Sequence, residues 1–246
     1  METKAVWGDS PVSVALPPEA GFACLVVCPL MLVVTASQKC QVLVIQLGNW
    51  LMMSWGILKA LNIDQVVLVG HSMGGMVAQQ FCLDHAEQVR GLVLATTLVA
   101  DRGNRLISKR IELDSRQEIL SVAFDRHFDL WFFNRTSGDV RAGVKTQMRL
   151  TPELPAQALV RSYAGCDPTD RLQKIRSPTL VIGTQSDHST SASCSQELAQ
   201  LIPGSDLVLI DDCGHFPMQE KPEEISRELL AFIYKNAIAK RWHDDK

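Results

Sequence analysis

Residues 65–78, QVVLVGHSMGGMVA, determine how the rest of the chain can be organised. The apolar residues 66–69 predict a buried strand, which stops at Gly70 before helix-compatible sequence resumes. A strand, a sharp turn and a helix are therefore expected in immediate succession. Such a turn requires small residues two positions before and two positions after its tip, and Gly70 and Gly74 meet that requirement. Ser72 is left at the tip of the turn.

This pattern is the G-x-S-x-G nucleophile elbow. The helix that begins after Ser72 directs its free N–H groups and the positive end of its dipole at negative charge forming near the serine oxygen. Met73 begins that helix, so its backbone N–H is predicted to be one oxyanion donor. A glycine-rich turn with an incidental serine is the alternative. The apolar strand before the turn and the small-residue helix after it are the context that the motif demands, and they favour the nucleophile.

With these features the chain resembles the α/β-hydrolase superfamily, in which the elbow of many esterases and lactonases has the sequence GHSMGG. The resemblance extends from about Trp55 to the C-terminal helix, and the region from Tyr163 to Ile175 is similar to the enol-lactonase branch. It implies an α/β fold with a mostly parallel central sheet flanked by helices. Residues 1–97 and 177–246 would form the hydrolase core, and residues 98–176 an inserted helical cap.

The remaining sequence agrees with this organisation. Continuous apolar runs predict buried strands at residues 23–28, 41–45, 89–97, 178–182 and 206–210. Residues 1–20 predict an opening hairpin at a sheet edge. Residues 98–176 lack a convincing strand and carry apolar residues at helical spacing, as a cap would. The aromatic residues between 124 and 133 are more typical of cap core than of an acyl pocket. Pro222 begins an amphipathic helix whose apolar positions are Ile225, Leu229, Phe232 and Ile233.

A serine hydroxyl needs a base within hydrogen-bond reach, and histidine titrates in the useful range. Of six histidines, His215 is the predicted base, because it follows the strand 206–210 in a Gly-His-Phe-Pro turn, where the superfamily places its base. Asp187, at the end of the strand 178–182, is predicted to orient that histidine. Asp101 is the substitute acid, because some relatives carry the acid after the preceding strand. Asp211 and Asp212 are expected to shape the turn before His215.

The N-terminal part departs from the family pattern. In relatives the first of the parallel strands ends in His-Gly, and the loop beyond it donates a second oxyanion N–H. Here the matching residues are Cys28 and Pro29, and proline has no N–H, so Leu30 is the positional candidate for that donor. The linker from Gly48 to the elbow is also short. A more open or impaired active-site mouth is expected.

Composition narrows the possible partners. A chain of 246 residues with 46% hydrophobic content suits one domain with an insertion. The net charge of -3 comes from positive and negative residues that are well mixed along the chain, which argues against nucleic acid or an anionic membrane as partner.

The cysteines and the longest apolar run bear on location. Seven cysteines without a CxxC pair predict free thiols, no metal site and a cytoplasmic, reducing location. Residues 22–34 are too short to span a bilayer and contain Pro29, so they predict interior strand.

These residues predict a serine hydrolase that cleaves a small carboxylic ester or lactone through an acyl-enzyme, without a cofactor. Ser72 in place of an aspartate nucleophile argues against a haloalkane dehalogenase. Two alternatives stay open. The same three residues support carbon–carbon bond hydrolysis or perhydrolysis in other members of the superfamily, and a catalytically weak or inactive member could bind a ligand. The sequence leaves the acyl size and the oligomeric state open.

Overall fold

The computed structural model describes residues 58–59, 64–99, 128–150 and 168–238, and it gives residues 3–6, 13–16, 23–28 and 31–35 as backbone strands. The strands are β1 (Thr3–Val6), β2 (Ser13–Leu16), β3 (Ala23–Cys28), β4 (Met31–Thr35), β5 (Val66–His71), β6 (Val89–Ala95), β7 (Thr179–Thr184) and β8 (Asp206–Ile210). The α-helices are α2 (Met73–Asp84), α5 (Gly138–Leu150), α7 (Ala192–Leu201), α8 (Pro217–Glu220) and α9 (Pro222–Lys235). Short 3₁₀ helices lie at Ala86–Gln88, Phe128–Trp131 and Thr169–Lys174.

A six-stranded sheet in the order β4-β3-β5-β6-β7-β8 forms the centre of the molecule. Strands β3, β5, β6, β7 and β8 of this sheet pair in parallel, and β4 at its edge pairs antiparallel with β3. Helix α2 connects β5 to β6, and α7 connects β7 to β8, as βαβ units require. The predicted mostly parallel sheet is therefore confirmed, and the carboxyl ends of β5, β7 and β8 lie along one edge of it.

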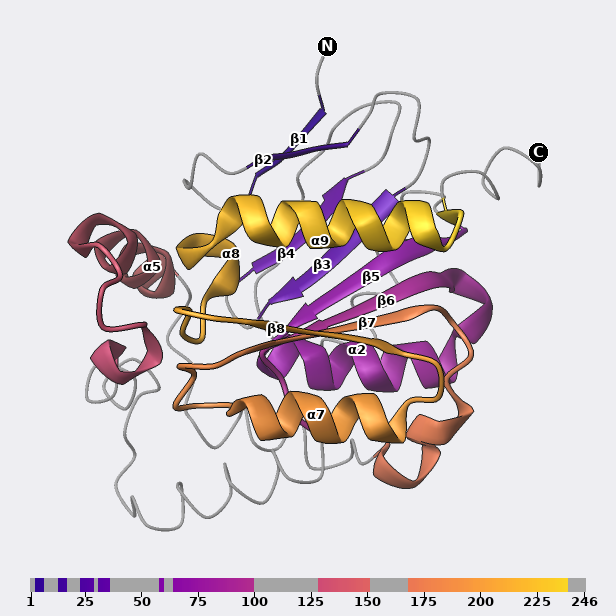
Figure 1. Cartoon of the computed structure of the whole chain (residues 1–246). Coiled ribbons are helices and arrows are strands. Elements are labelled where there is room, and N and C mark those ends of the chain that lie inside the picture. Colours follow the sequence, from indigo (N-terminus) through magenta and orange to yellow (C-terminus); the bar gives the residue numbers. More distant parts are fainter. Residues whose placement is uncertain are drawn as a thin grey trace, which may run out of the picture.

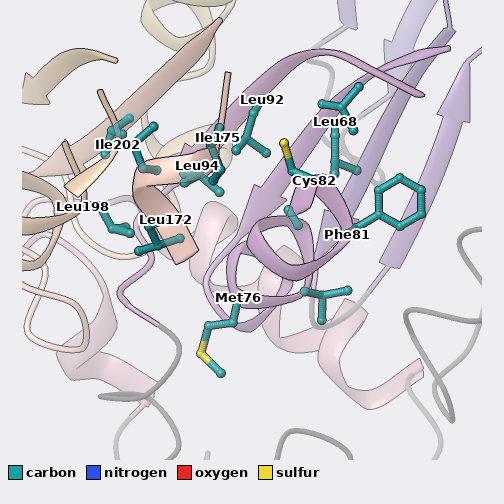
Figure 2. Packing of buried hydrophobic residues seen from close by; sticks show 14 of the residues in the cluster. Leu68, Met76, Phe81, Cys82, Leu92, Leu94, Leu172, Ile175, Leu198 and Ile202 are labelled. Atoms are coloured by element: carbon teal, nitrogen blue, oxygen red, sulfur yellow. The ribbon is translucent and has the colours of Figure 1, made fainter. Parts of the chain in front are cut away.

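Both faces of the sheet are covered, which explains why its strands are apolar without alternation. Figure 1 shows α9 on one face and α2 and α7 on the other. Val66 and Leu68 of β5 pack on the side of α2 with Phe81, whereas Val67 and Val69 pack on the side of α9. Figure 2 shows the first of these cores, where side chains from the strands, α2 and α7 interdigitate. The apolar face predicted for α9 is confirmed: its buried residues are Ile225, Leu229, Phe232 and Ile233.

The N-terminal strands differ from expectation in two ways. The predicted opening hairpin forms, but β1 and β2 make a separate two-stranded sheet instead of an edge of the main one. The strand predicted at residues 23–28 is confirmed as β3. The wider apolar run at residues 22–34 was expected to be interior strand. It divides into β3 and β4, which pair antiparallel with Cys28 opposite Met31. Pro29 follows β3 and cannot donate a ladder hydrogen bond, so a chain reversal there is physically reasonable. The predicted strand at residues 41–45 lies outside the described residues.

Much of the region predicted as a cap, residues 98–176, also lies outside the described part. The described part of it contains α5 and two of the short 3₁₀ helices. Figure 1 shows α5 beyond the end of the sheet, beside α8. The division into a core and an inserted cap therefore stays a prediction. No helix in the described ranges is long and apolar enough to cross a bilayer.

Candidate active site

Ser72 occupies the turn between β5 and α2 in a strained backbone conformation, with φ 52° and ψ −123°. A positive φ at a residue with a side chain costs roughly 1–3 kcal/mol, so the surroundings must hold it in place. The Ser72 N–H donates to the Ala95 carbonyl (3.1 Å). The Ser72 carbonyl accepts the Gly75 N–H (2.9 Å) and the Thr97 hydroxyl (2.6 Å). The main chain on both sides of the Ser72 side chain is thereby fixed to β6 and to the residues after it.

Two glycines allow the strand and the helix to approach at this turn. A Cβ on Gly70 would lie 2.6 Å from the Cα of Gly75, and a Cβ on Gly75 would lie 2.5 Å from the Thr97 side chain. The need for a small residue at position 70 is confirmed. The requirement at position 75 was missed, because it arises from Thr97, which is more than twenty residues further along the chain.

The structure brings together the three side chains that the sequence singled out. Ser72 Oγ lies 2.9 Å from Nε2 of His215, and Nδ1 of His215 lies 2.8 Å from Oδ2 of Asp187. Each follows the carboxyl end of a different parallel strand, namely β5, β8 and β7. Open α/β sheets gather functional groups at that edge. Residues separated by 143 and by 28 positions thus form one hydrogen-bonded chain.

Asp187 is held as a carboxylate that can only accept hydrogen bonds. It is 4% exposed and accepts the N–H groups of Ser189 and Thr190 as well as the Thr190 hydroxyl. Burial alone would raise the pKa of Asp187, but attraction to His215 and the hydrogen bonds from His215 and Thr190 outweigh it and lower the pKa below 3.8. Because the carboxylate has no proton to donate, Nδ1 of His215 carries the hydrogen. Nε2 is then free to accept the Ser72 hydroxyl proton.

The backbone of His215 is anchored on both sides. Its carbonyl accepts Nε2–H of His71 (2.7 Å) and the hydroxyl of Thr96 (3.1 Å), and its N–H donates to the Trp131 carbonyl (2.5 Å). Burial, reinforced by the charge of His215, lowers the pKa of His71 to about 3, so that ring stays neutral. No sequence pattern assigned His71 a role. Its ring lies 5.1 Å from the His215 ring, centroid to centroid.

The other candidates lie elsewhere. His188 is exposed next to Asp187, and His85 packs on Phe81 away from Ser72. Asp211 and Asp212 are both exposed, and the positive φ of Asp212 (51°) agrees with its predicted role in the turn. Asp101, His127 and His243 lie outside the described residues. Among the described residues no group of three His, Cys, Asp or Glu side chains could hold a metal ion.

Comparison with known proteins identifies the family. Residues 52–222 match the model of the alpha/beta hydrolase fold family. The chain belongs to this family.

Three relatives illustrate the range of reactions named within the family. A protein of Rhizobium rhizogenes, provisionally named carbamate hydrolase RutD, is 29% identical over 70% of this chain and 68% of its own length. The 2-hydroxymuconate semialdehyde hydrolase of Pseudomonas putida is 27% identical over 76% of this chain and 68% of its own. The structure of Est816, described as an N-acyl homoserine lactone degrading enzyme, superposes with a TM-score of 0.61 and 28% identity over 76% of each chain. The relatives share the hydrolase family and differ in the bond that their names specify.

The structure describes one of the two predicted oxyanion donors and not the other. Met73 is the first residue of α2, where no carbonyl of the same helix can accept its N–H. That N–H follows Ser72 directly, as the prediction requires. Leu30 lies outside the described residues, so its role stays a prediction.

An aromatic cluster borders the histidine. Phe128 and Phe132 are buried against Phe216 and Val144, so they are core residues, as expected, and they do not line a pocket; that they belong to a cap stays a prediction. Trp131 is half-buried instead, and its ring centroid lies 6.2 Å from that of His215. Trp131 is therefore the described residue of this segment that best fits a wall beside the reacting atoms.

Proposed function

We propose that the protein is a serine hydrolase that cleaves a small carboxylic ester or lactone through an acyl-enzyme. The observation that carries the proposal is the hydrogen-bonded chain from Ser72 Oγ through His215 to Asp187. A serine hydroxyl is a poor nucleophile, and a histidine of fixed tautomer at 2.9 Å provides the base that it lacks. The strained turn at Ser72 and the anchored backbone of His215 hold these groups in register before a substrate arrives.

In this mechanism the Ser72 oxygen attacks the carbonyl carbon while its proton passes to Nε2 of His215. The Met73 N–H stabilises the oxyanion, and Leu30 is the candidate for a second donor. The intermediate collapses as His215 gives the proton to the leaving alkoxide, and the acyl group stays on Ser72. Water then attacks the acyl carbon and gives its proton to His215. Release of the acid returns that proton to Ser72.

Short-chain p-nitrophenyl esters test the proposal. Ser72→Ala and His215→Ala should lower turnover by a factor on the order of 10⁴ to 10⁶, because each removes a group that acts only together with the other. Ser193→Ala and His188→Gln are matched controls, since both residues are exposed and lie outside the hydrogen-bonded chain. Both controls should keep wild-type turnover. A folded wild-type protein without turnover would instead favour a ligand-binding member of the family.

Carbon–carbon bond hydrolysis is a second candidate, favoured by the likeness to the 2-hydroxymuconate semialdehyde hydrolase of Pseudomonas putida. The same serine, histidine and aspartate would serve both reactions, so the substrate distinguishes them. Turnover of 2-hydroxymuconate semialdehyde well above that of p-nitrophenyl esters would move the assignment to this reaction.

A further inference from the structure

Glu220, the last residue of α8, collects four hydrogen bonds on its carboxylate. Oε2 accepts the Phe133 N–H (2.9 Å), the Thr136 hydroxyl (2.5 Å) and the Gly214 N–H (3.2 Å), and Oε1 accepts the Phe216 N–H (3.2 Å). Two of the donors flank His215 in sequence, and the other two belong to the segment after the 3₁₀ helix Phe128–Trp131. One side chain therefore joins the loop that carries His215 to a segment more than eighty residues away.

The two segments also touch through their backbones. His215 donates its N–H to the Trp131 carbonyl at 2.5 Å. A Cβ on Gly214 would lie 2.7 Å from Cα of Phe132, so only glycine permits this approach. These backbone contacts join the two segments at Gly214 and His215, and the Phe132 ring stacks on that of Phe216 (5.1 Å between centroids). Glu220 adds restraints on both sides of His215, at Gly214 and at Phe216.

The chemistry of the donor set requires a carboxylate. An ionised carboxylate has two acceptor oxygens and no hydrogen, which suits a set of partners made entirely of N–H and O–H donors. A glutamine amide has a single oxygen, so at least one N–H would face an NH₂ group. Glu220 is only partly buried, yet the four hydrogen bonds of its carboxylate all come from residues 214–216 beside His215 and from residues 133–136.

We propose that Glu220 is a positioning residue for His215: it ties residues 214–216 to residues 133–136 and so sets the distance from Nε2 of His215 to Ser72 Oγ. This inference rests on the proposed function, in which that distance governs proton transfer. A misplacement of about 1 Å at reacting atoms can cost on the order of 10²-fold in rate, even when the change is remote from the chemistry.

The test compares Glu220→Gln with Glu223→Gln, which removes the same charge from an exposed position three residues away. The readouts are kcat and KM for a p-nitrophenyl ester, the rate at which a fluorophosphonate labels Ser72, and the far-downfield proton NMR signal of Nδ1–H in His215. Glu220→Gln should lower kcat and the labelling rate by about 10-fold to 100-fold, leave KM within about threefold, and shift or broaden the NMR signal. Glu223→Gln should match wild type in all of them.

Wild-type labelling and an unchanged NMR signal in Glu220→Gln would overturn the inference and leave the proposed function intact. Failure of the wild type to label or turn over would instead reject the proposed function, while the NMR comparison would still test Glu220. Thr136→Val covers the case in which Glu220→Gln does not fold. It removes only the hydroxyl donor and should lower the labelling rate by about 3-fold to 10-fold, with wild-type behaviour contradicting the inference.

Discussion

His71 should make the stability of the protein sensitive to mild acid. Its ring is fully buried, and burial together with the neighbouring charge of His215 lowers its pKa from 6.5 to about 3. In the unfolded chain the same imidazole is free to take up a proton near pH 6.5. Between these two values the unfolded state binds one more proton than the native state, so the free energy of unfolding falls as the pH falls.

The loss of stability at a given pH follows from how far that pH lies below the unfolded-state pKa of His71. A pH of 5 lies about one and a half units below the ordinary histidine pKa, and each unit is worth about 1.4 kcal/mol. The titration of His71 should therefore lower the free energy of unfolding at pH 5 by about 2 kcal/mol relative to pH 7.5. Asp187 contributes little between pH 5 and pH 7.5, because its lowered native pKa and the ordinary pKa of an aspartate in the unfolded chain both lie below pH 5, so it stays ionised in both states. The loss would continue towards pH 3.

His71→Gln isolates this contribution, because a glutamine amide can donate to the His215 carbonyl but does not titrate. Urea unfolding of both proteins at several values between pH 5 and pH 7.5 gives the measurement. From pH 7.5 to pH 5 the free energy of unfolding should fall by about 2 kcal/mol more in the wild type than in His71→Gln. A pH-independent difference in stability between the two proteins does not affect this comparison. Parallel loss of stability in the two proteins would refute the claim that His71 is neutral in the native state.

Two further substitutions probe the geometry of the site. Asp187→Asn should lower kcat by a factor on the order of 10⁴, because an amide can leave the histidine in the wrong tautomer, and turnover equal to wild type would move the acid role to Asp101. Gly75→Ala should lower the free energy of unfolding by about 1–3 kcal/mol in urea, because the new Cβ would lie 2.5 Å from the Thr97 side chain. Gly138→Ala, which meets nothing within 4 Å, is the control, and equal stability of the two variants would contradict the close packing at the elbow.

The regular part of the fold could be predicted from local sequence. Strands β5, β6 and β7 are buried on both faces, and such strands leave continuous apolar runs that are easily recognised. The edge strand β8 is partly exposed, yet its run of Leu, Val and Ile was recognised as well. Helix α9 covers one face only and therefore has a clear apolar stripe. The apolar run at residues 22–34 was harder, because continuous hydrophobicity does not indicate where a chain reverses.

The candidate site was only partly predictable, for a physical reason. Ser72, His215 and Asp187 stand at turns that directly follow strands, so a motif and the strand ends locate them. His71, Thr96 and Glu220 act on the backbone of His215 or on its loop, and no local pattern marks those contacts. His71 and His215 are 144 residues apart, and Thr96 and His215 are 119 apart. The roles predicted for Leu30 and Asp101 lie outside the described residues and remain predictions.

The nucleophilic role of Ser72 is the claim on which the other proposals depend, and the mass of the intact protein after reaction with a fluorophosphonate tests it most directly. We predict one covalent adduct on the wild-type protein, located on the peptide that contains Ser72, and none on Ser72→Ala. Unlabelled wild-type protein, or an adduct of equal yield on Ser72→Ala, would contradict the account.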